Sequence, residues 1–199
     1  MKICITLDDV LRAKTKAFGK IYQKYVDKNI DLKSLYVTTN DLSKVFGFTD
    51  KKSFNKFLYD DYPFEIFAEA PVVKKMLDKK LNLWHIELSD KYGDDVTLCL
   101  ANPFEFNASI GFTCFFLSQI ATRVREIYFP KNSSDIWNVC DVLVTADPKL
   151  LAEKPEDKIT VKIEMPYNEE LGSDFTYSDL EAFLEDEEIV EKLVEKCSK

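Results

Sequence analysis

The stretch that decides the fold is Lys2-Ile-Cys-Ile-Thr-Leu7, which is followed directly by Asp8-Asp9-Val10-Leu11. The first part is short and almost continuously apolar, as expected for a strand in a sheet that is covered on both faces. Asp8 or Asp9 can cap a helix that follows, because a carboxylate accepts hydrogen bonds from the free N–H groups of a first turn. From Val10 to Val26 apolar residues recur at steps of three and four, which predicts an amphipathic helix.

A second series of strands and helices begins after the turn Gly93-Asp94-Asp95. The pattern predicts, in order, a strand at 95–100, a helix at 106–122, a strand at 125–129, a short helix at 135–139, and strands at 141–144 and 158–165. Alternation of this kind favours parallel strands joined by right-handed crossovers. The sequence therefore predicts an α/β fold with a doubly wound parallel sheet, whose core comprises residues 1–14 and 93–170.

The segment between these two parts is rich in aromatic residues and in helix signals. Residues 41–46 end at Gly47, Asp50 can cap a helix over 51–59, and a longer helical stretch over 64–81 is interrupted at Pro71. We therefore expect residues 15–92 to form an inserted helical cap subdomain with its own core, and a hydrophobic ligand pocket there is the alternative. Residues 171–199 are predicted to form an acidic helical tail, which either docks or binds a partner.

Composition excludes several classes of protein. Of the 199 residues, 46% are hydrophobic, and 27 Lys and Arg stand against 35 Asp and Glu, giving a net charge of −8. Broad binding to nucleic acid or to anionic membranes is not expected, because both need clustered positive charge. No apolar run reaches the roughly 18 residues of a membrane span, and the N-terminal run is too short for a signal peptide. The five scattered cysteines are typical of free, buried thiols in a reducing compartment.

Ligands of doubly wound sheets bind beyond the carboxyl ends of the strands, so those ends indicate where a site would be. One predicted strand ends in Thr6-Leu7-Asp8-Asp9, and another ends in Thr145-Ala146-Asp147-Pro148. Together with the later Met165-Pro-Tyr-Asn168, these segments resemble the haloacid dehalogenase (HAD) superfamily, in particular its 5′-nucleotidase branch. The resemblance covers most of residues 1–170 through the order of elements, including a helical cap inserted after the first strand.

The resemblance implies a role for each position. In that family the first strand carries a nucleophilic Asp and an acid–base Asp. A later pair of Asp residues holds Mg²⁺, and the Mg²⁺ and a Lys together neutralise the charge of the phosphate. In this sequence the nucleophile position falls on Thr6 and the acid–base position on Asp8. Lys131 is a loose match for the Lys, and the metal-binding pair falls on Thr145 and Ala146.

These departures predict a vestigial pocket without catalytic activity, metal or other cofactor. A threonine hydroxyl is not acidic near neutral pH, and the sequence places no base beside Thr6. Loss of one group that stabilises charge in the transition state typically lowers the rate by a factor of about 10²–10³. Here the nucleophilic carboxylate and the metal-binding pair are absent together. The alternative is an active Mg²⁺-dependent 5′-nucleotidase or phosphatase with rearranged carboxylates, in which Asp8, Asp9 and Asp147 hold the metal. Without that chemistry, Asp8 and Asp9 are a helix-capping pair.

Other candidate sites are weaker. His85 is the sole histidine and has no partner visible in the sequence, so we interpret it as structural. The five glycines are isolated, and none belongs to a phosphate-binding loop. A further alternative is a non-catalytic regulator that binds a nucleotide through Lys131 and the helix start after Asp8.

Residues 102–119, 123–129 and 135–137 are similar to proteins that are encoded beside the virion genes of crAss-like bacteriophages of gut Bacteroidales, which themselves resemble HAD phosphatases. This second resemblance implies a structural virion protein, made in the host cytoplasm and placed in the portal–tail assembly. The expected partners are other virion proteins and further copies of the chain in a ring-forming homo-oligomer, without a membrane. A fold that keeps its scaffold but loses its chemistry suits such a role.

Overall fold

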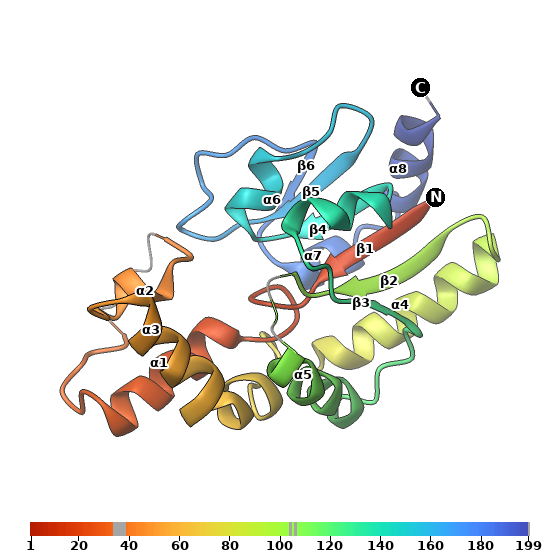
Figure 1. Ribbon diagram of the computed structural model, residues 1–199. Coiled ribbons are helices and arrows are strands. Elements are labelled where there is room, and N and C mark those ends of the chain that lie inside the picture. Colours follow the sequence, from red (N-terminus) through yellow and green to blue (C-terminus); the bar gives the residue numbers. More distant parts are fainter. Residues whose placement is uncertain (34–38, 104, 106, 199) are drawn as a thin grey trace.

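The structure is a computed structural model that describes residues 1–33, 39–103, 105 and 107–198 (Figure 1). Within these residues, six strands form one sheet in the order β3-β2-β1-β4-β5-β6, and every neighbouring pair is parallel. The strands are β1 (Lys2–Thr6), β2 (Thr97–Ala101), β3 (Glu126–Tyr128), β4 (Val142–Thr145), β5 (Ile159–Ile163) and β6 (Phe175–Tyr177). The predicted doubly wound α/β class is confirmed, and the strand order reverses between β1 and β4.

Successive residues of the central strands point to opposite faces of the sheet, as pleated strands require. On one face Ile3 and Ile5 of β1 pack in a cluster with residues of α4 (Leu77–Tyr92), α5 (Asn107–Gln119), α7 (Leu180–Leu184) and α8 (Ile189–Cys197). On the other face Cys4 packs with residues of the short helix η3 (Ser133–Asn138) and of α6 (Pro148–Ala152). Both faces are therefore covered, which explains the continuous apolar run of β1.

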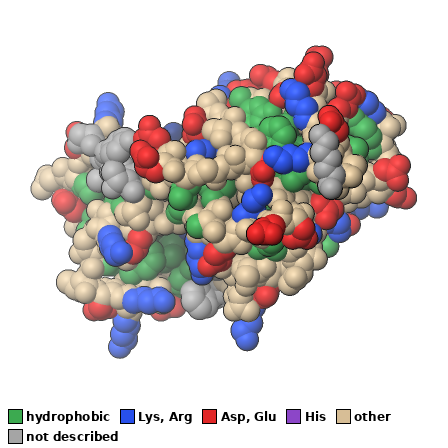
Figure 2. All heavy atoms as spheres, turned by 90° about the horizontal axis from the view of Figure 1, so that it is seen from above, with side chains coloured by type: hydrophobic (Ala, Val, Ile, Leu, Met, Phe, Trp, Pro, Cys, Tyr) green, Lys and Arg blue, Asp and Glu red, His purple; other side chains and the backbone are tan. Residues whose placement is uncertain are grey.

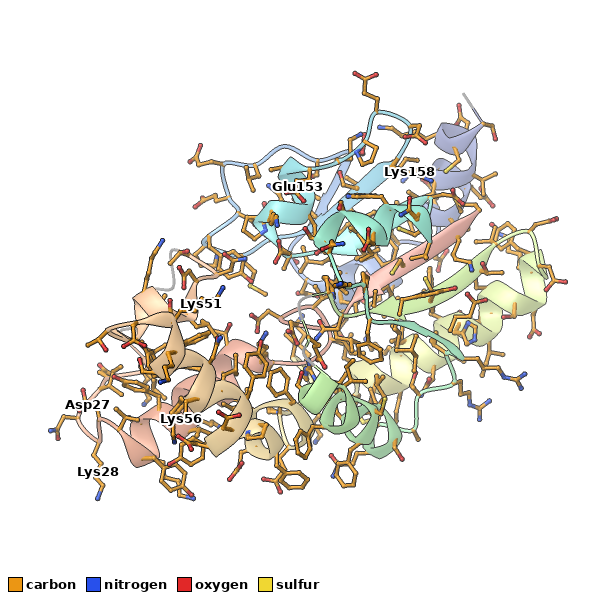
Figure 3. All side chains as sticks on the ribbon, in the orientation of Figure 1. Asp27, Lys28, Lys51, Lys56, Glu153 and Lys158 are labelled. Carbon is orange, nitrogen blue, oxygen red and sulfur yellow. The ribbon has the colours of Figure 1, made fainter. Side chains whose placement is uncertain are left out.

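The described residues of 14–68 form a second set of helices at one side of the sheet, whereas α4, at the end of the predicted insertion, packs on the sheet itself (Figure 1). This set comprises α1 (Lys14–Tyr25), α2 (Leu42–Val45), α3 (Lys51–Asn55) and the π-helical segments η1 (Lys56–Asp61) and η2 (Phe64–Ala68). Its buried cluster centres on Phe18, whose ring centroid lies 4.9 Å from that of Phe46 and 5.1 Å from that of Phe57. Asp27 and Lys28 lie at its far tip, opposite Glu153 and Lys158 on the sheet half of the molecule (Figure 3).

Two predicted helix signals in the insertion are confirmed. Asp50 accepts a hydrogen bond of 2.7 Å from the backbone N–H of Ser53 and so caps α3. Gly47 follows α2 with φ of +64°, the left-handed conformation that glycine adopts without a steric penalty. The division of the chain into a core, an insertion and a tail stays a prediction.

The first helix begins at Lys14, not at Val10 as predicted. Three successive backbone N–H groups, of Val10, Leu11 and Arg12, donate to the carbonyl of Leu7, so the chain turns tightly here. It then runs beside residues 71–73, with Ala13 N–H bonded to the Pro71 carbonyl. Val10 and Leu11 are 1% and 0% exposed, so their apolar character reflects burial under this turn rather than a helix face.

The tail that was predicted to be helical contains two helices, α7 and α8, but it begins with a strand. β6 extends the sheet by pairing with β5, with Phe175 opposite Val161. Beyond it α7 and α8 dock on the sheet, where Phe183 and Leu193 are fully buried. A strand of three residues carries too little alternation to be recognised in the sequence.

The cysteine prediction holds in part. Five free cysteines are present, of which Cys4, Cys99 and Cys140 are buried in one cluster, whereas Cys114 and Cys197 are exposed. Among the described residues, no helix is both long and apolar enough to cross a membrane.

Candidate functional site

A cavity of about 90 Å³ opens where the strand order reverses, at the carboxyl ends of β1 and β4. Its walls come from β1 and the turn after it, from the start of α1, from the start of α2 and the residues before it, from α6, and from the segments that follow β2, β4 and β5. The lining residues are Thr6, Asp8, Asp9, Lys14, Thr15, Asn40, Leu42, Asn102, Pro103, Asp147, Leu150 and Tyr167. This is the position at which a doubly wound sheet binds its ligand.

Thr6, which lines the cavity, lies beside Thr145 at the carboxyl ends of β1 and β4. The Thr6 hydroxyl lies 3.1 Å from the Thr145 hydroxyl and 3.4 Å from the carbonyl oxygen of Val144. Both threonines are buried, at 3% and 0% exposure. Ala146 is also buried, and its carbonyl accepts a hydrogen bond of 2.9 Å from the Asn168 amide. The structure therefore brings these three predicted positions to the strand ends, where they supply two hydroxyls bonded to each other and a methyl group.

Asp8 is held by two cations. Its Oδ1 accepts from Arg12 Nε at 2.9 Å and from Arg12 Nη2 at 2.6 Å, and its Oδ2 lies 2.6 Å from Lys14 Nζ. Burial would raise the pKa of Asp8, but the charges of Arg12 and Lys14 outweigh burial and lower the pKa to about 2. Asp8 is thus a permanent carboxylate near neutral pH and has no proton to give to a leaving group.

Arg12 is the centre of a buried polar network that the sequence analysis missed. It is 0% exposed, and its guanidinium donates to Glu105 at 2.8 Å, to the Thr113 hydroxyl at 2.5 Å and to the Phe67 carbonyl at 3.1 Å. The side chain of Glu105 is only 2% exposed. The sequence gives little indication of this role. Arg12 is a single charged residue with apolar neighbours, and such a pattern does not show whether the side chain is buried or exposed.

Asp9 and Asp147 both serve as caps. Asp9 has φ of +58°, and its carboxylate accepts from the Thr15 backbone N–H at 2.9 Å and from the Thr15 hydroxyl at 2.5 Å, which ties the turn to the start of α1. Asp147 accepts from the N–H groups of Lys149 and Leu150 at 2.8 and 3.1 Å and so caps α6. Burial raises the pKa of both carboxyl groups. The predicted capping role falls on Asp9 rather than on Asp8.

The arrangement does not suit Mg²⁺. Asp8, Asp9 and Asp147 do line one cavity, but every carboxylate oxygen of the three already accepts a hydrogen bond, the last of them from Asn40 Nδ2 at 3.3 Å. In the part of the chain that the structure describes, no group of three or more His, Cys, Asp or Glu side chains could hold a metal ion. The hard, oxygen-rich coordination that Mg²⁺ needs is therefore not formed by these residues as they stand.

Two other predicted residues lie away from the cavity. Lys131 is exposed and lines a separate surface hollow with Asn132 and Glu153. His85 lies on α4, and burial together with the charge of Arg125 lowers its pKa. Lys131 thus follows the end of β3 but does not line the cavity that contains Thr6 and Asp8.

Comparison with known proteins shows a shared fold with solved structures, at 10–13% sequence identity. No family model matches the chain, and no curated protein matches it. Among solved structures, a haloacid dehalogenase-like hydrolase from Burkholderia xenovorans has a TM-score of 0.54 at 10% identity, over 97% of each chain. A HAD-superfamily hydrolase from Geobacter sulfurreducens has a TM-score of 0.55 at 10% identity, over 96% of this chain and 95% of that one. A HAD-hydrolase from Bacillus subtilis, bound to magnesium, has a TM-score of 0.55 at 13% identity, over 97% of this chain and 98% of that one.

Proposed function

We propose that this chain, whose sheet and flanking helices have the HAD-like hydrolase fold, is a catalytically inactive protein that serves as a structural component of a bacteriophage virion. The inactive part of the proposal is supported by the residues of the cavity. The virion part is supported by the resemblance to proteins of crAss-like bacteriophages. The proposed place is a ring in the portal–tail assembly, with other virion proteins as partners and the host cytoplasm as the site of synthesis.

The observation that carries the proposal is the pair of hydroxyls of Thr6 and Thr145, 3.1 Å apart, at the strand ends. A hydroxyl there attacks phosphorus only if a base removes its proton, and the nearest hydrogen-bonding partners are another hydroxyl and a carbonyl. The cavity also carries three aspartates against one lysine, Lys14, so an entering phosphate would be repelled rather than held.

The second candidate function is a Mg²⁺-dependent nucleotidase or phosphatase with rearranged acids. One observation favours it: Asp8, Asp9 and Asp147 line the same cavity instead of lying on different faces. It requires Asp8 to give up Lys14 and requires the two capping aspartates to release the helix starts that they bind. We rank it second because each of these contacts would have to be broken.

We expect the purified chain to release no phosphate from a panel of nucleoside monophosphates and from p-nitrophenyl phosphate in the presence of Mg²⁺. The measurement is inorganic phosphate released over hours at high protein concentration, compared with Asp8→Asn as a matched variant that alters the cavity. Equal, background-level rates for both proteins are expected. Mg²⁺-dependent turnover that Asp8→Asn abolishes would establish the second candidate instead. Mass spectrometry of purified virions tests the structural role, which predicts recovery of the chain in multiple copies.

Self-association has a suitable surface on α5. No charged residue occurs between Glu105 and Arg123, although 31% of the chain is charged. Phe115 is 45% exposed and its ring lies 5.7 Å from that of Phe64, which is 39% exposed. Elsewhere, acidic and basic side chains are interspersed over the face seen in Figure 2. Because each copy carries a net charge of −8, an uncharged face is where a second copy approaches with least repulsion.

Phe115→Glu is therefore expected to weaken self-association, because it places a charge at the centre of the uncharged face of α5. Light scattering after size-exclusion chromatography should give a mass above one chain for the wild type and a shift toward one chain for the variant. Leu83→Glu is the matched control, since Leu83 is an exposed apolar residue, 56% accessible, on α4. A wild type that stays a single chain at all concentrations, or equal effects of both variants, would contradict the role of α5.

A further inference from the structure

The cavity contains a fixed positive charge among carboxylates, in a fold whose solved relative from Bacillus subtilis binds magnesium. We propose that the ammonium group of Lys14 takes the place of a divalent cation in this chain, so that the cavity is stabilised without metal. The proposal rests on the proposed loss of catalysis and explains how the acidic residues of the cavity remain tolerable without Mg²⁺.

Geometry supports this role of Lys14. It is the first residue of α1, its Nζ lies 2.6 Å from Asp8 Oδ2, and it lines the same cavity as Asp9 and Asp147. The side chains of Lys14 and Asp8 are each only 22% exposed, so water screens their attraction weakly. The Nζ also lies 5.5 Å from the centroid of the Phe67 ring, which favours a cation on that side.

Carboxylates outnumber positive groups around Lys14, so its positive charge reduces the repulsion among them. The other cation beside Asp8 is Arg12, and its guanidinium is shared with the buried Glu105. Two positive groups therefore face four carboxylates, those of Asp8, Asp9, Asp147 and Glu105. Burial would lower the pKa of Lys14, but Asp8 outweighs burial and raises the pKa, so the ammonium stays charged.

Removing the ammonium group should leave a space lined by oxygen atoms. Asp8 Oδ2 would then keep only the Asn102 amide, 3.4 Å away, as a partner. Asp9, Asp147 and the hydroxyl of Thr6 line the same space. Mg²⁺ is commonly held by one or two carboxylates together with waters, so Asp8 Oδ2, once freed from Lys14, should let the vacated site accept a divalent cation while Asp9 and Asp147 keep their capping contacts.

The test compares the thermal unfolding of the wild type, Lys14→Met and Lys16→Met in EDTA and in MgCl₂, CaCl₂ or MnCl₂, with titration calorimetry of each ion. Lys16→Met is the matched control, because Lys16 is exposed on the same helix and lies outside the cavity. We expect Lys14→Met to unfold at a lower temperature in EDTA and to regain about 4 °C or more at saturating metal. The wild type and Lys16→Met should not respond.

A double variant, Asp8→Asn with Lys14→Met, removes both charges and should fold in EDTA without responding to metal. If Lys14→Met shows no metal response while the double variant folds, the proposal is overturned, even where Lys14→Met alone is unfolded. Saturable binding of Mg²⁺ in the cavity by the wild type would also overturn it. The phosphate-release assay is independent of these readouts, so a wild type that binds Mg²⁺ without turnover refutes only the role of Lys14.

Discussion

Arg12→Met is expected to lower the free energy of unfolding by about 3–5 kcal/mol, the usual cost of removing one partner from a buried ion pair. Arg12 is 0% exposed and bonds to Asp8 and to Glu105, whose side chain is 2% exposed. Methionine fills much of the same volume but leaves the Glu105 carboxylate buried without its cation. Urea unfolding followed by circular dichroism measures the loss, provided that the slope with urea is unchanged.

Two further variants separate charge from packing. Adding Glu105→Gln to Arg12→Met removes the unpaired buried charge and should recover part of the lost stability. Lys16→Met, on the exposed side of α1, should change stability by no more than about 0.5 kcal/mol. An Arg12→Met protein as stable as Lys16→Met would show that the buried network around Arg12 contributes nothing to the free energy of unfolding.

Acid is expected to destabilise the protein steeply between about pH 4 and pH 2. For Asp174, hydrogen bonds to Lys196, Lys154 and the Thr160 backbone outweigh burial and lower its pKa to about 2, the same value as for Asp8. A carboxyl group whose pKa is lower in the folded state stabilises the protein fully above its unfolded value of 3.8. That contribution, about 2 kcal/mol for each aspartate, is lost as the pH falls through the folded value.

For Asp9 and Asp147 the effect of pH on stability has the opposite sign. Burial raises their pKa in the folded protein, so their ionised forms oppose folding above the raised value, and protonation relieves this as the pH falls toward 3.8. The stability maximum should therefore lie in mild acid, above pH 4 and below neutrality. Urea midpoints at pH 7, 5, 3.5 and 2.5 test both statements, and Asp174→Asn should halve the loss below pH 4. Equal midpoints at pH 5 and pH 2.5 would contradict the assignment.

The sequence was sufficient for the sheet but only in part for the site. β1, β2, β4 and β5 were predicted because buried parallel strands are continuous apolar runs bounded by turns. The strand ends then located the cavity, with Thr6 and Asp8 in its lining and Thr145 hydrogen-bonded to Thr6 beside it. Lys131 lines a different hollow, because its match depended on chain order after β3, where a few residues of loop decide which way a side chain points.

Contacts between distant segments were not accessible from the sequence. Arg12 meets Glu105 and Thr113 across 93 and 101 positions of the chain. Lys14 belongs to the cavity because the turn after β1 follows residues 71–73 and delays the helix, which a periodic pattern does not record. Phe175–Tyr177 became a strand through pairing with β5, a tertiary effect on a segment without a strong preference of its own.

The outermost strands have a consequence for how copies of this protein can meet. β3 and β6, at the two rims of the sheet, have only three residues each. Short rims give an incoming strand few backbone groups to bind, which guards against edge-to-edge growth of the sheet into fibrils. Contacts between copies in an ordered array should therefore be made by side chains on the helices. Many copies can then lie close together without their sheet edges pairing into amyloid.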